Sequence, residues 1–450
     1  MTERKVSKLP RDPGPAAWDA LLAERQPHPA LEGDITADWV IIGGGFAGLA
    51  AAQRLKQLRG DDQVVLLEAQ AIATGPAGRN SGFMIDLPHE LGADSYAASL
   101  EKDRLQIKLN RHAISFAAEA AAEYEMPEEA LLKIGRINGT VEASGEKHNA
   151  EYAAHLDGLA EEYTTLDAQQ MQQITGSSFY RSGLFMPGAV LLQPALYIRC
   201  LADGLVKSWA HHFQLFEHSP ALSFTRSGGC WQVKTPNGSV TAPHIILAVN
   251  GHAESFGFFT NRLMHVFTYA SMTQPLDKAQ LKALGGESRW GITPSDPMGS
   301  TIRRISGTGG DRIVIRNRWS FEPSMEVSDA KIERFGRDQD ISFRRRFPQL
   351  GDIQMEYRWS GRLCLSRNSS PAFGEVENGI FSACCQNGLG TAKGTLAGIG
   401  AVDLAVKANS EITHDLLSYP VPAKLPPAPF AQWGASAVIA WREFKAGLER

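Results

Sequence analysis

Long apolar runs are missing from this sequence, and cysteines are few. The five cysteines follow neither a disulfide framework nor the spacing of a zinc site: Cys200, Cys230, Cys364, Cys384 and Cys385. The sequence contains no run of about eighteen apolar residues, so no transmembrane helix is predicted. The first forty residues also lack the apolar core of a signal peptide. These absences predict a cytoplasmic protein in a reducing environment, with no metal site.

An excess of charge of either sign is also missing. The chain has 45 Lys and Arg against 49 Asp and Glu, a formal net charge of −4. This balance predicts no nucleic-acid partner, and no basic run predicts a membrane surface. With 450 residues, the chain exceeds the size at which a single core stops growing. Two closely connected domains are therefore expected.

The sequence does contain a complete strand–turn–helix–strand pattern between Asp38 and Glu68. An apolar strand is followed by G-x-G-x-x-G, an Ala/Leu-rich helix and a second apolar strand, at residues 40–42, 43–48, 49–58 and 64–67. A lone G-x-G-x-x-G is weak evidence, but all the elements that should surround it are present here. The pattern predicts a dinucleotide-binding βαβ unit; the alternative is an ordinary Gly-rich turn.

The residues of this motif have separate physical roles. Gly43 permits the tight turn out of the strand, Gly45 lets backbone N–H groups approach a pyrophosphate, and Gly48 lets the helix pack against the sheet. The anion would then lie at the positive N-terminus of the helix. Glu68 stands where a carboxylate accepts hydrogen bonds from a ribose 2′-OH. A free 2′-OH favours FAD or NAD over NADP.

The remaining segments suggest how the domains are built. Residues 1–37 are polar and Pro-rich, with an apolar cluster at Trp18, Leu21 and Leu22. They are either an extended arm that docks through this cluster or a partly disordered leader. The predicted boundaries are 38–100, 190–260 and 355–410 for the nucleotide-binding domain, 101–189 and 261–354 for an inserted substrate domain, and 411–450 for a C-terminal linker and helix.

Three further segments carry motifs that, together with the βαβ unit, are typical of one protein family. Residues 78–82 read Gly-Arg-Asn-Ser-Gly, and residues 244–251 form an apolar strand that ends in Asn-Gly. Trp359-x-Gly361 leads to a last glycine-rich loop at 387–390. With these motifs the chain resembles the D-amino-acid oxidase superfamily of FAD-dependent amine and amino-acid oxidases over most of residues 36–410. It is most similar to the γ-glutamylputrescine oxidase and glycine/sarcosine oxidase branch.

The resemblance implies a fold and a cofactor. The fold would be α/β (α+β), with a Rossmann-like FAD-binding domain of discontinuous segments and an inserted substrate domain on an antiparallel sheet. The last loop would bring a helix N-terminus to the pyrimidine end of the flavin. The residues implied to bind FAD are Gly43, Gly45, Phe46, Ala47, Gly48, Glu68, Ala69, Arg79, Asn80, Ser81, Gly82, Asn250, Gly251, Asn387, Gly388, Leu389, Gly390 and Thr391.

Three positions depart from the family pattern. The final loop has no histidine where the family has Gly-His-Gly, and Leu192-Gln193-Pro194 replaces Val-His-Pro. Ser300 to Arg304 keeps the arginine of the family's Tyr-x-Arg strand but not the tyrosine. The substrate therefore cannot be taken over from any one relative.

A cysteine near the position of Cys364 is bonded to the flavin in the sarcosine oxidases. For Cys364 the alternatives are a covalent link and a small buried thiol, and we expect non-covalent FAD. Cys384 and Cys385 are expected to be packing residues.

Arginines on the predicted strands of the inserted domain are candidates for holding a substrate carboxylate, since a guanidinium can bind it in a bidentate manner. They are Arg303, Arg304, Arg316 and Arg318. Strand alternation puts Arg303 and Arg304 on opposite faces and Arg316 and Arg318 on the same face. The alternative for each is a solvated face of the sheet. Together they hint at an acidic substrate, such as an N-substituted glycine or an imino diacid.

Two other side chains are catalytic candidates. Lys393 could stabilise the reduced flavin, since a nearby cation tunes flavin electronics. His265 is either an active-site base or an ordinary core or surface histidine.

Near the C-terminus, a helix with Trp433, Trp441 and Phe444 either lies on a membrane or, as we expect, docks on its own domain.

The predicted function is oxidation of the C–N bond of a small amine or amino acid to an imine, which then hydrolyses. The electron acceptor would be O₂ or a carrier. The alternatives are an NAD(P)H-dependent flavin reductase or monooxygenase, which would need a second nucleotide motif, and a non-catalytic FAD-stabilised subunit. The oligomeric state is left open.

Overall fold

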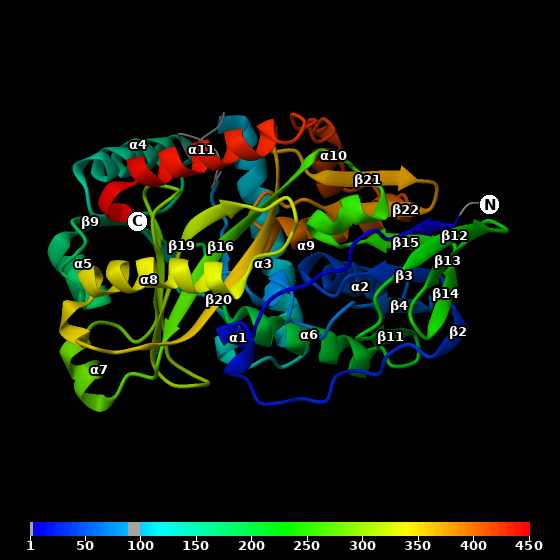
Figure 1. The fold of residues 1–450 in the computed structure, drawn as a ribbon, viewed down its shortest axis with the longest axis horizontal. Helices are drawn as coiled ribbons and strands as arrows, with labels where there is room; N and C mark the ends of the chain where they lie inside the picture. Colours follow the sequence, from blue (N-terminus) through cyan, green and yellow to red (C-terminus); the bar gives the residue numbers. More distant parts are fainter. Residues whose placement is uncertain (1–2, 89–99) are drawn as a thin grey trace.

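A computed structural model describes residues 3–88 and 100–450. Residues 89–99, within the predicted range 38–100, lie outside the described part. Figure 1 shows an elongated molecule, with a large sheet and its helices at one end and a nucleotide-binding sheet at the other. The N-terminal segment runs between the two ends as an extended trace.

A six-stranded sheet forms the centre of the nucleotide-binding part. Its order is β11 (Phe213–Phe216), β4 (Val64–Leu67), β3 (Trp39–Ile42), β15 (His244–Leu247), β22 (Ile380–Cys384) and β21 (Ala372–Glu377). The first five strands are parallel, and only β21 is antiparallel to its neighbour. Strands β3 and β4 are buried along their whole length, as expected for a parallel sheet covered on both faces.

Helices cover one face of this sheet, and a second sheet covers the other. The helices are α2 (Phe46–Leu58), α3 (Leu100–Glu123), α6 (Pro194–Ser208) and α9 (Ala392–Ala405), and they share one apolar core with the strands. On the other face lies a five-stranded sheet of β1 (Arg4–Lys5), β12 (Ser223–Ser227), β13 (Cys230–Lys234), β14 (Gly238–Ala242) and β2 (Gly33–Thr36). The chain before residue 38 supplies two of its strands.

An eight-stranded, mostly antiparallel sheet forms the second part. Its order is β20 (Met355–Ser366), β16 (Leu263–Thr273), β19 (Arg312–Phe321), β18 (Thr301–Ile305), β17 (Trp290–Pro294), β7 (Arg136–Thr140), β9 (Ser182–Met186) and β8 (Thr164–Asp167). Helix α8 (Asp329–Arg346) packs on β20, β16 and β19, at one edge of this sheet. The remaining helices there are α4 (Ala143–Leu159), α5 (Ala168–Thr175), α7 (Lys278–Leu284) and α11 (Phe430–Lys445).

Short elements join the two parts. A three-stranded sheet holds β5 (Phe83–Met84), β10 (Val190–Leu192) and β6 (Leu131–Leu132). Helix α1 (Ala17–Ala20) lies in the N-terminal segment, and α10 (Glu411–Ser418) follows α9. The predicted fold class is confirmed. The domain boundaries stay a prediction, with two differences. Residues 355–366 pair with β16 and so lie in the large sheet, and α3, nearly all of which falls in the range 101–189 predicted for the substrate domain, packs in the core of the nucleotide-binding part.

The N-terminal segment, residues 3–37, is an ordered arm. Trp18 is completely buried in the core of the nucleotide-binding part. Its indole Nε1 donates to the carbonyl of Asn80 at 2.8 Å, and Gln193 Nε2 donates to the Trp18 carbonyl at 2.7 Å. The first alternative from the sequence, an arm that docks through this cluster, is therefore what the structure shows.

Helix α11 docks on β19, as expected, but not through its large aromatic residues. Ala435 and Ile439 pack against the large sheet, whereas Trp433, Trp441 and Phe444 are exposed. The outward face is thus the more aromatic one. None of the helices in the described residues has the length and apolarity needed to cross a membrane.

Candidate active site and cofactor pocket

The turn between β3 and α2 requires its glycines. Gly43 has φ +104°, and a Cβ on it would lie 2.6 Å from the carbonyl oxygen of Ala248. A Cβ on Gly48 would lie 1.8 Å from the carbonyl oxygen of Gly43. A Cβ on Gly45 would meet nothing closer than the Ala77 side chain at 3.5 Å, so space is open above the N-terminus of α2. The turn therefore presents helix N–H groups to a space that an anion can enter.

Glu68 stands at the end of β4 as expected. Its Oε2 accepts a hydrogen bond from Gly44 N at 2.7 Å, and its Oε1 accepts one from Gln70 N at 2.9 Å. Burial is the largest influence and raises the pKa of Glu68, while these backbone donors oppose it. A carboxylate fixed in this way points its remaining acceptor capacity into the pocket, where hydroxyl donors would stabilise its charge.

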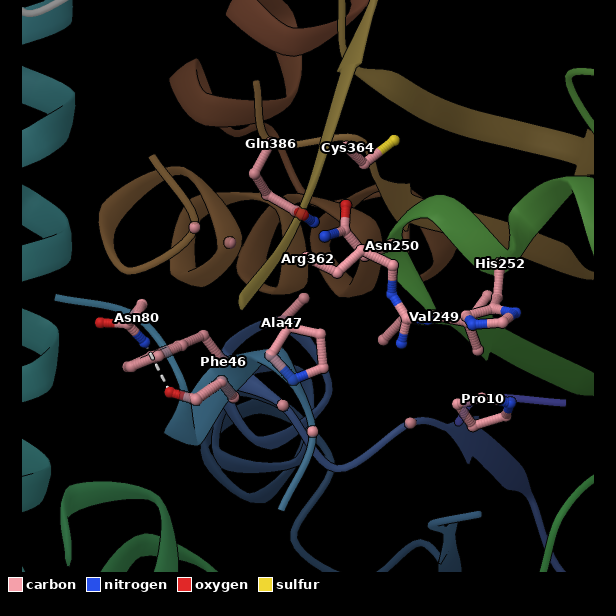
Figure 2. A pocket seen from close by; sticks show the side chains of 18 of the residues that line it. Pro10, Phe46, Ala47, Asn80, Val249, Asn250, His252, Arg362, Cys364 and Gln386 are labelled. Atoms are coloured by element: carbon pink, nitrogen blue, oxygen red, sulfur yellow. Dashed lines mark hydrogen bonds between the residues drawn. The ribbon is translucent and has the colours of Figure 1, made fainter. Parts of the chain in front are cut away.

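One long pocket runs from this turn to the large sheet. Among the residues expected to bind FAD, it is lined by Gly43, Gly45, Phe46, Ala47, Glu68, Ala69, Asn80, Ser81, Asn250, Gly388, Leu389, Gly390 and Thr391. Figure 2 shows Phe46 and Asn80 towards one side of this space and His252 towards the other. Segments from five separate parts of the chain thus meet around a single cavity.

Five residues expected to bind FAD lie behind the lining instead. Gly48 packs α2 against the turn, and Gly82 N donates a hydrogen bond to Asn80 Oδ1 at 2.7 Å. Gly251 faces the ring of His265, and Asn387 Oδ1 accepts from Ser366 N at 2.8 Å. Arg79 is buried and donates to backbone carbonyls, including that of Ser360 at 3.3 Å. These residues shape the loops that form the wall of the pocket.

The last glycine-rich loop leads directly into α9. Gly388 to Thr391 line the pocket, and Thr391 Oγ1 donates to the Phe83 carbonyl at 2.7 Å. Lys393, one turn further on, lies in a separate hollow beside Asp415. The N-terminus of α9 therefore faces the pocket, whereas the Lys393 side chain does not line it.

Four of the five candidate catalytic side chains do not line the pocket in the structure: Lys393, His265, Arg303 and Arg304. Arg303 is buried below Gly82 and donates to the carbonyls of Ser81 and Leu192 at 3.0 and 2.7 Å. Burial lowers the pKa of Arg303 to about 9. Its neighbour Arg304 points the other way, as strand alternation requires, and donates to the Gly285 carbonyl at 2.5 Å.

His265 lies behind the pocket wall. Its Nε2 is 2.9 Å from Glu254 Oε2, and the ring packs against Gly251. Of the two alternatives considered from the sequence, an ordinary core histidine fits this position. Cys364, its partner on the neighbouring strand, does line the pocket. Burial is the main cause that raises the pKa of Cys364, which keeps it a thiol.

Arg316 reaches the pocket from β19. It lies directly opposite Thr301 on β18, and both line the cavity together with Thr293 of β17. Thr301 Oγ1 is buried and has no hydrogen-bond partner among the residues described. Thr293 Oγ1 is already bonded to Arg136 and Asn138. These strands thus present one cation to the same space and one hydroxyl group, that of Thr301, that has no partner in the described part of the chain.

The expectation that Arg316 and Arg318 share a face is wrong. The register between β16 and β19 shifts at this point, so that Thr268 and Tyr269 oppose Trp319 and Asn317, and Arg318 is the extra residue. Arg318 has φ +61° and turns to the α8 side, where it meets Asp338 and Glu443. A β-bulge resets the alternation that the sequence prediction relied on.

Sequence reasoning missed two contributions to the pocket. Residues 6–12 of the arm line it at Val6, Lys8, Leu9, Pro10 and Asp12. Arg362 of β20 lines it as well, and its Nη2 is 3.3 Å from Asp12 Oδ2. Arg362 is the one charged residue in the second half of β20, which was a signal, but nothing in residues 6–12 resembles a nucleotide-binding motif.

The pocket has features that fit FAD. Gly45 leaves room at a helix N-terminus, Glu68 is fixed at the end of the second strand, and the buried Asn250 Oδ1 has no partner in residues 3–88 and 100–450. The family model for FAD-dependent oxidoreductases designated DAO matches residues 38–404. The chain belongs to the DAO family of FAD-dependent oxidoreductases.

Individual DAO relatives are similar to the chain along most of their length. A probable oxidoreductase OrdL from Rhizobium meliloti (strain 1021) is 25% identical over 425 residues, 91% of each chain. The γ-glutamylputrescine oxidoreductase of Escherichia coli (strain K12) is 21% identical over 377 residues, 83% of this chain and 84% of the relative.

Solved structures show the same fold. Glycine oxidase from Geobacillus kaustophilus superimposes with a TM-score of 0.67 and 17% identity, covering 84% of this chain and 96% of that one. Iminodiacetate oxidase from Chelativorans sp. BNC1 gives a TM-score of 0.66 with 14% identity, covering 86% and 100%. The predicted family, cofactor and enzyme class are confirmed: this is an FAD-dependent oxidoreductase of the DAO family.

Proposed function

We propose that this DAO-family enzyme oxidises the C–N bond of a small amine or amino acid that carries a carboxylate. The observation that carries the proposal is Arg316, which faces the FAD pocket beside Thr301 and Thr293. The relatives named above include enzymes for glycine, iminodiacetate and γ-glutamylputrescine, and their named substrates support an amine or amino acid here.

Arg316 is the arginine best placed to hold an anionic group. Arg303 donates to two loop carbonyls, Arg304 lies on the opposite face of β18, and Arg318 pairs with acidic residues on the α8 side. Arg316 instead lines the cavity, with its guanidinium carbon 5.4 Å from the ring centre of Trp319. A guanidinium held beside a ring face can bind a carboxylate through two N–H groups.

The Thr301 hydroxyl and the apolar wall have a second role. Thr301 Oγ1 offers a donor and an acceptor next to Arg316, which would fix the orientation of the substrate. The pocket is otherwise lined largely by apolar and small residues, which include Phe83, Ile85 and Leu363. Removing an amine from water disfavours its charged form, so the pocket favours the neutral amine that can be oxidised.

FAD supplies the capacity to accept two electrons from the substrate. We propose that it is bound non-covalently, since Cys364 is held as a buried thiol. The oxidised substrate is an imine, which adds water to give a carbonyl compound and an amine. The final electron acceptor, O₂ or a carrier, is open, and we place the reaction in the cytoplasm on the grounds of the sequence.

The proposal is tested by adding candidate substrates to the FAD-loaded protein without oxygen. The set includes sarcosine, glycine, iminodiacetate, D-alanine and L-proline, each paired with an amide or ester that removes the carboxylate charge. We expect at least one carboxylate compound to bleach the flavin and its uncharged partner to do so poorly. Bleaching by NADH or NADPH alone would instead support the reductase alternative.

A further inference from the structure

The N-terminal arm crosses the cofactor pocket along its length. Between β1 and α1 the chain is extended, and five of its residues face the cavity: Val6, Lys8, Leu9, Pro10 and Asp12. Figure 1 shows this segment as the blue trace that leaves the N-terminal end and passes across the molecule to α1. In Figure 2, Pro10 lies near His252 at one side of the pocket.

One end of this segment is fixed near Glu68. Val6 N donates to the Leu222 carbonyl at 2.8 Å, and Ser7 N donates to the Ser255 carbonyl at 2.9 Å. The chain just before Leu222 is tied to Glu68, since Ser219 N donates to the Glu68 carbonyl at 2.8 Å. Glu68 marks the ribose side of a dinucleotide site, so the arm begins its crossing at the ribose end.

The other end is fixed by the loop that follows β4. Arg79 donates to the carbonyl of Pro13 at 3.2 Å and also to that of Gly14. The carbonyl of Asn80 accepts the indole N–H of Trp18 at 2.8 Å. Asn80 itself lines the pocket. The arm and the loop therefore hold each other in place on both sides of the cavity.

An ion pair joins the last residue of the crossing, Asp12, to the large sheet. Asp12 Oδ2 lies 3.3 Å from Arg362 Nη2, and the two side chains are only 2% and 4% exposed. Arg362 also donates to the Met325 carbonyl at 3.0 Å. Both charges line the pocket, so lifting the arm would leave a nearly buried arginine without its carboxylate.

We propose that residues 6–12 are one wall of the FAD site, and that the Asp12–Arg362 pair keeps this wall closed over the bound cofactor. FAD then enters and leaves when the segment lifts, and the affinity of the protein for FAD depends on a carboxylate at position 12. The inference rests on the FAD site itself, and it holds whichever amine is the substrate.

The test compares FAD release from two variants of the holoprotein. Asp12→Asn breaks the ion pair that lines the pocket. Asp19→Asn is the matched control: Asp19 lies on the same arm but outside the pocket, and its Oδ1 is 2.7 Å from Arg199 Nη2. Ultrafiltration gives the dissociation constant, and the fluorescence of freed FAD gives the release rate. We expect Asp12→Asn to weaken binding by about tenfold or more, since it strands a buried charge. We expect Asp19→Asn to stay within about twofold, because the pair it breaks is more exposed.

A second measurement needs no variant. Trypsin is expected to cut the arm after Lys8 and Arg11 when the arm lifts, so saturating FAD should slow this cleavage about tenfold relative to protein depleted of FAD. The proposal would be overturned if the wild type, Asp12→Asn and Asp19→Asn bound FAD equally well, or if both variants lost the same FAD affinity. Cleavage of the arm at a rate that does not respond to FAD would also overturn it. None of these readouts depends on the substrate, so they are separate from tests of the amine reaction.

Discussion

Arg316 on β19 lies directly opposite Thr301 on β18, and both side chains line the same pocket. The pocket also contains the glycine-rich turn at the N-terminus of α2. The large antiparallel sheet therefore presents a cation and a hydroxyl group to the space in which the family holds FAD. The reaction we propose depends on this relationship.

Arg316 should matter for substrates with a carboxylate, and Arg304 should not. Arg316→Gln would lose a charge-assisted contact of about 1.5–3 kcal/mol, or roughly ten- to a hundredfold in kcat/KM. Arg304→Gln, on the same sheet but outside the pocket, is the control and should change kcat/KM less than about threefold. Steady-state kinetics on the substrate found by bleaching measure both. A similar loss in the two variants would contradict the assignment.

Gly48 should tolerate no side chain. A Cβ there would lie 1.8 Å from the Gly43 carbonyl oxygen. Gly48→Ala should therefore destabilise the protein by about 1–3 kcal/mol or more and lower its FAD content. Gly434→Ala is the control, because no atom lies within 4 Å of a Cβ at that helical position; it should stabilise by up to about 1 kcal/mol. Thermal unfolding and the bound flavin absorbance show both effects.

His252 should make the protein sensitive to acid. Burial is the largest cause that lowers the pKa of His252, to about 3 from an ordinary 6.5. The unfolded state therefore binds a proton first as the pH falls, and stability is lost between pH 6.5 and about 3. In His252→Gln this loss should shrink by on the order of 1 kcal/mol per pH unit.

Urea unfolding at several pH values between 6.5 and 4.5, with equal FAD, measures the two slopes. Parallel slopes in the wild type and in His252→Gln would show that this imidazole is already charged in the folded protein.

Glu443 should stabilise the C-terminal helix more than its aromatic neighbour does. Its Oε2 lies 3.1 Å from Arg318 Nη1, and its Oε1 accepts a hydrogen bond from Trp319 N at 2.9 Å. Glu443→Ala should cost about 1–3 kcal/mol, since it removes one of the two carboxylates that pair with Arg318 and leaves the buried Trp319 N–H without its acceptor. Phe444→Ala should change the free energy of unfolding by less than about 0.5 kcal/mol, because this ring is 82% exposed. Chemical denaturation of both variants tests the comparison.

The parts of the site that were predictable from sequence are formed by neighbouring residues. The turn at Gly43 to Gly48 and the carboxylate of Glu68 follow from a short pattern, because each residue is required by contacts within one βαβ unit. The family resemblance supplied the later segments, such as Asn250 and the loop before α9. Sequence alternation also placed Arg303 and Arg304 correctly on opposite faces of β18.

The parts that were missed depend on contacts between distant segments or on local irregularity. Asp12 and Arg362 are separated by 350 positions, and neither belongs to a motif. Arg318 changed faces because of a single extra residue in β19, for which the sequence carries no glycine signal. The outward aromatic face of α11 was missed because the helix is buried through Glu443 and small residues, against the usual apolar pattern.

The proposed oxidation of an amine with a carboxylate can be followed in the visible spectrum of the FAD-loaded protein under argon. Sarcosine, glycine, iminodiacetate, D-alanine, L-proline and putrescine derivatives would be added one at a time, followed by NADH and NADPH. We expect loss of the oxidised flavin band with at least one amine that carries a carboxylate, and a much slower loss in Arg316→Gln. Bleaching by a nicotinamide nucleotide but by none of the amines would contradict the proposed oxidation.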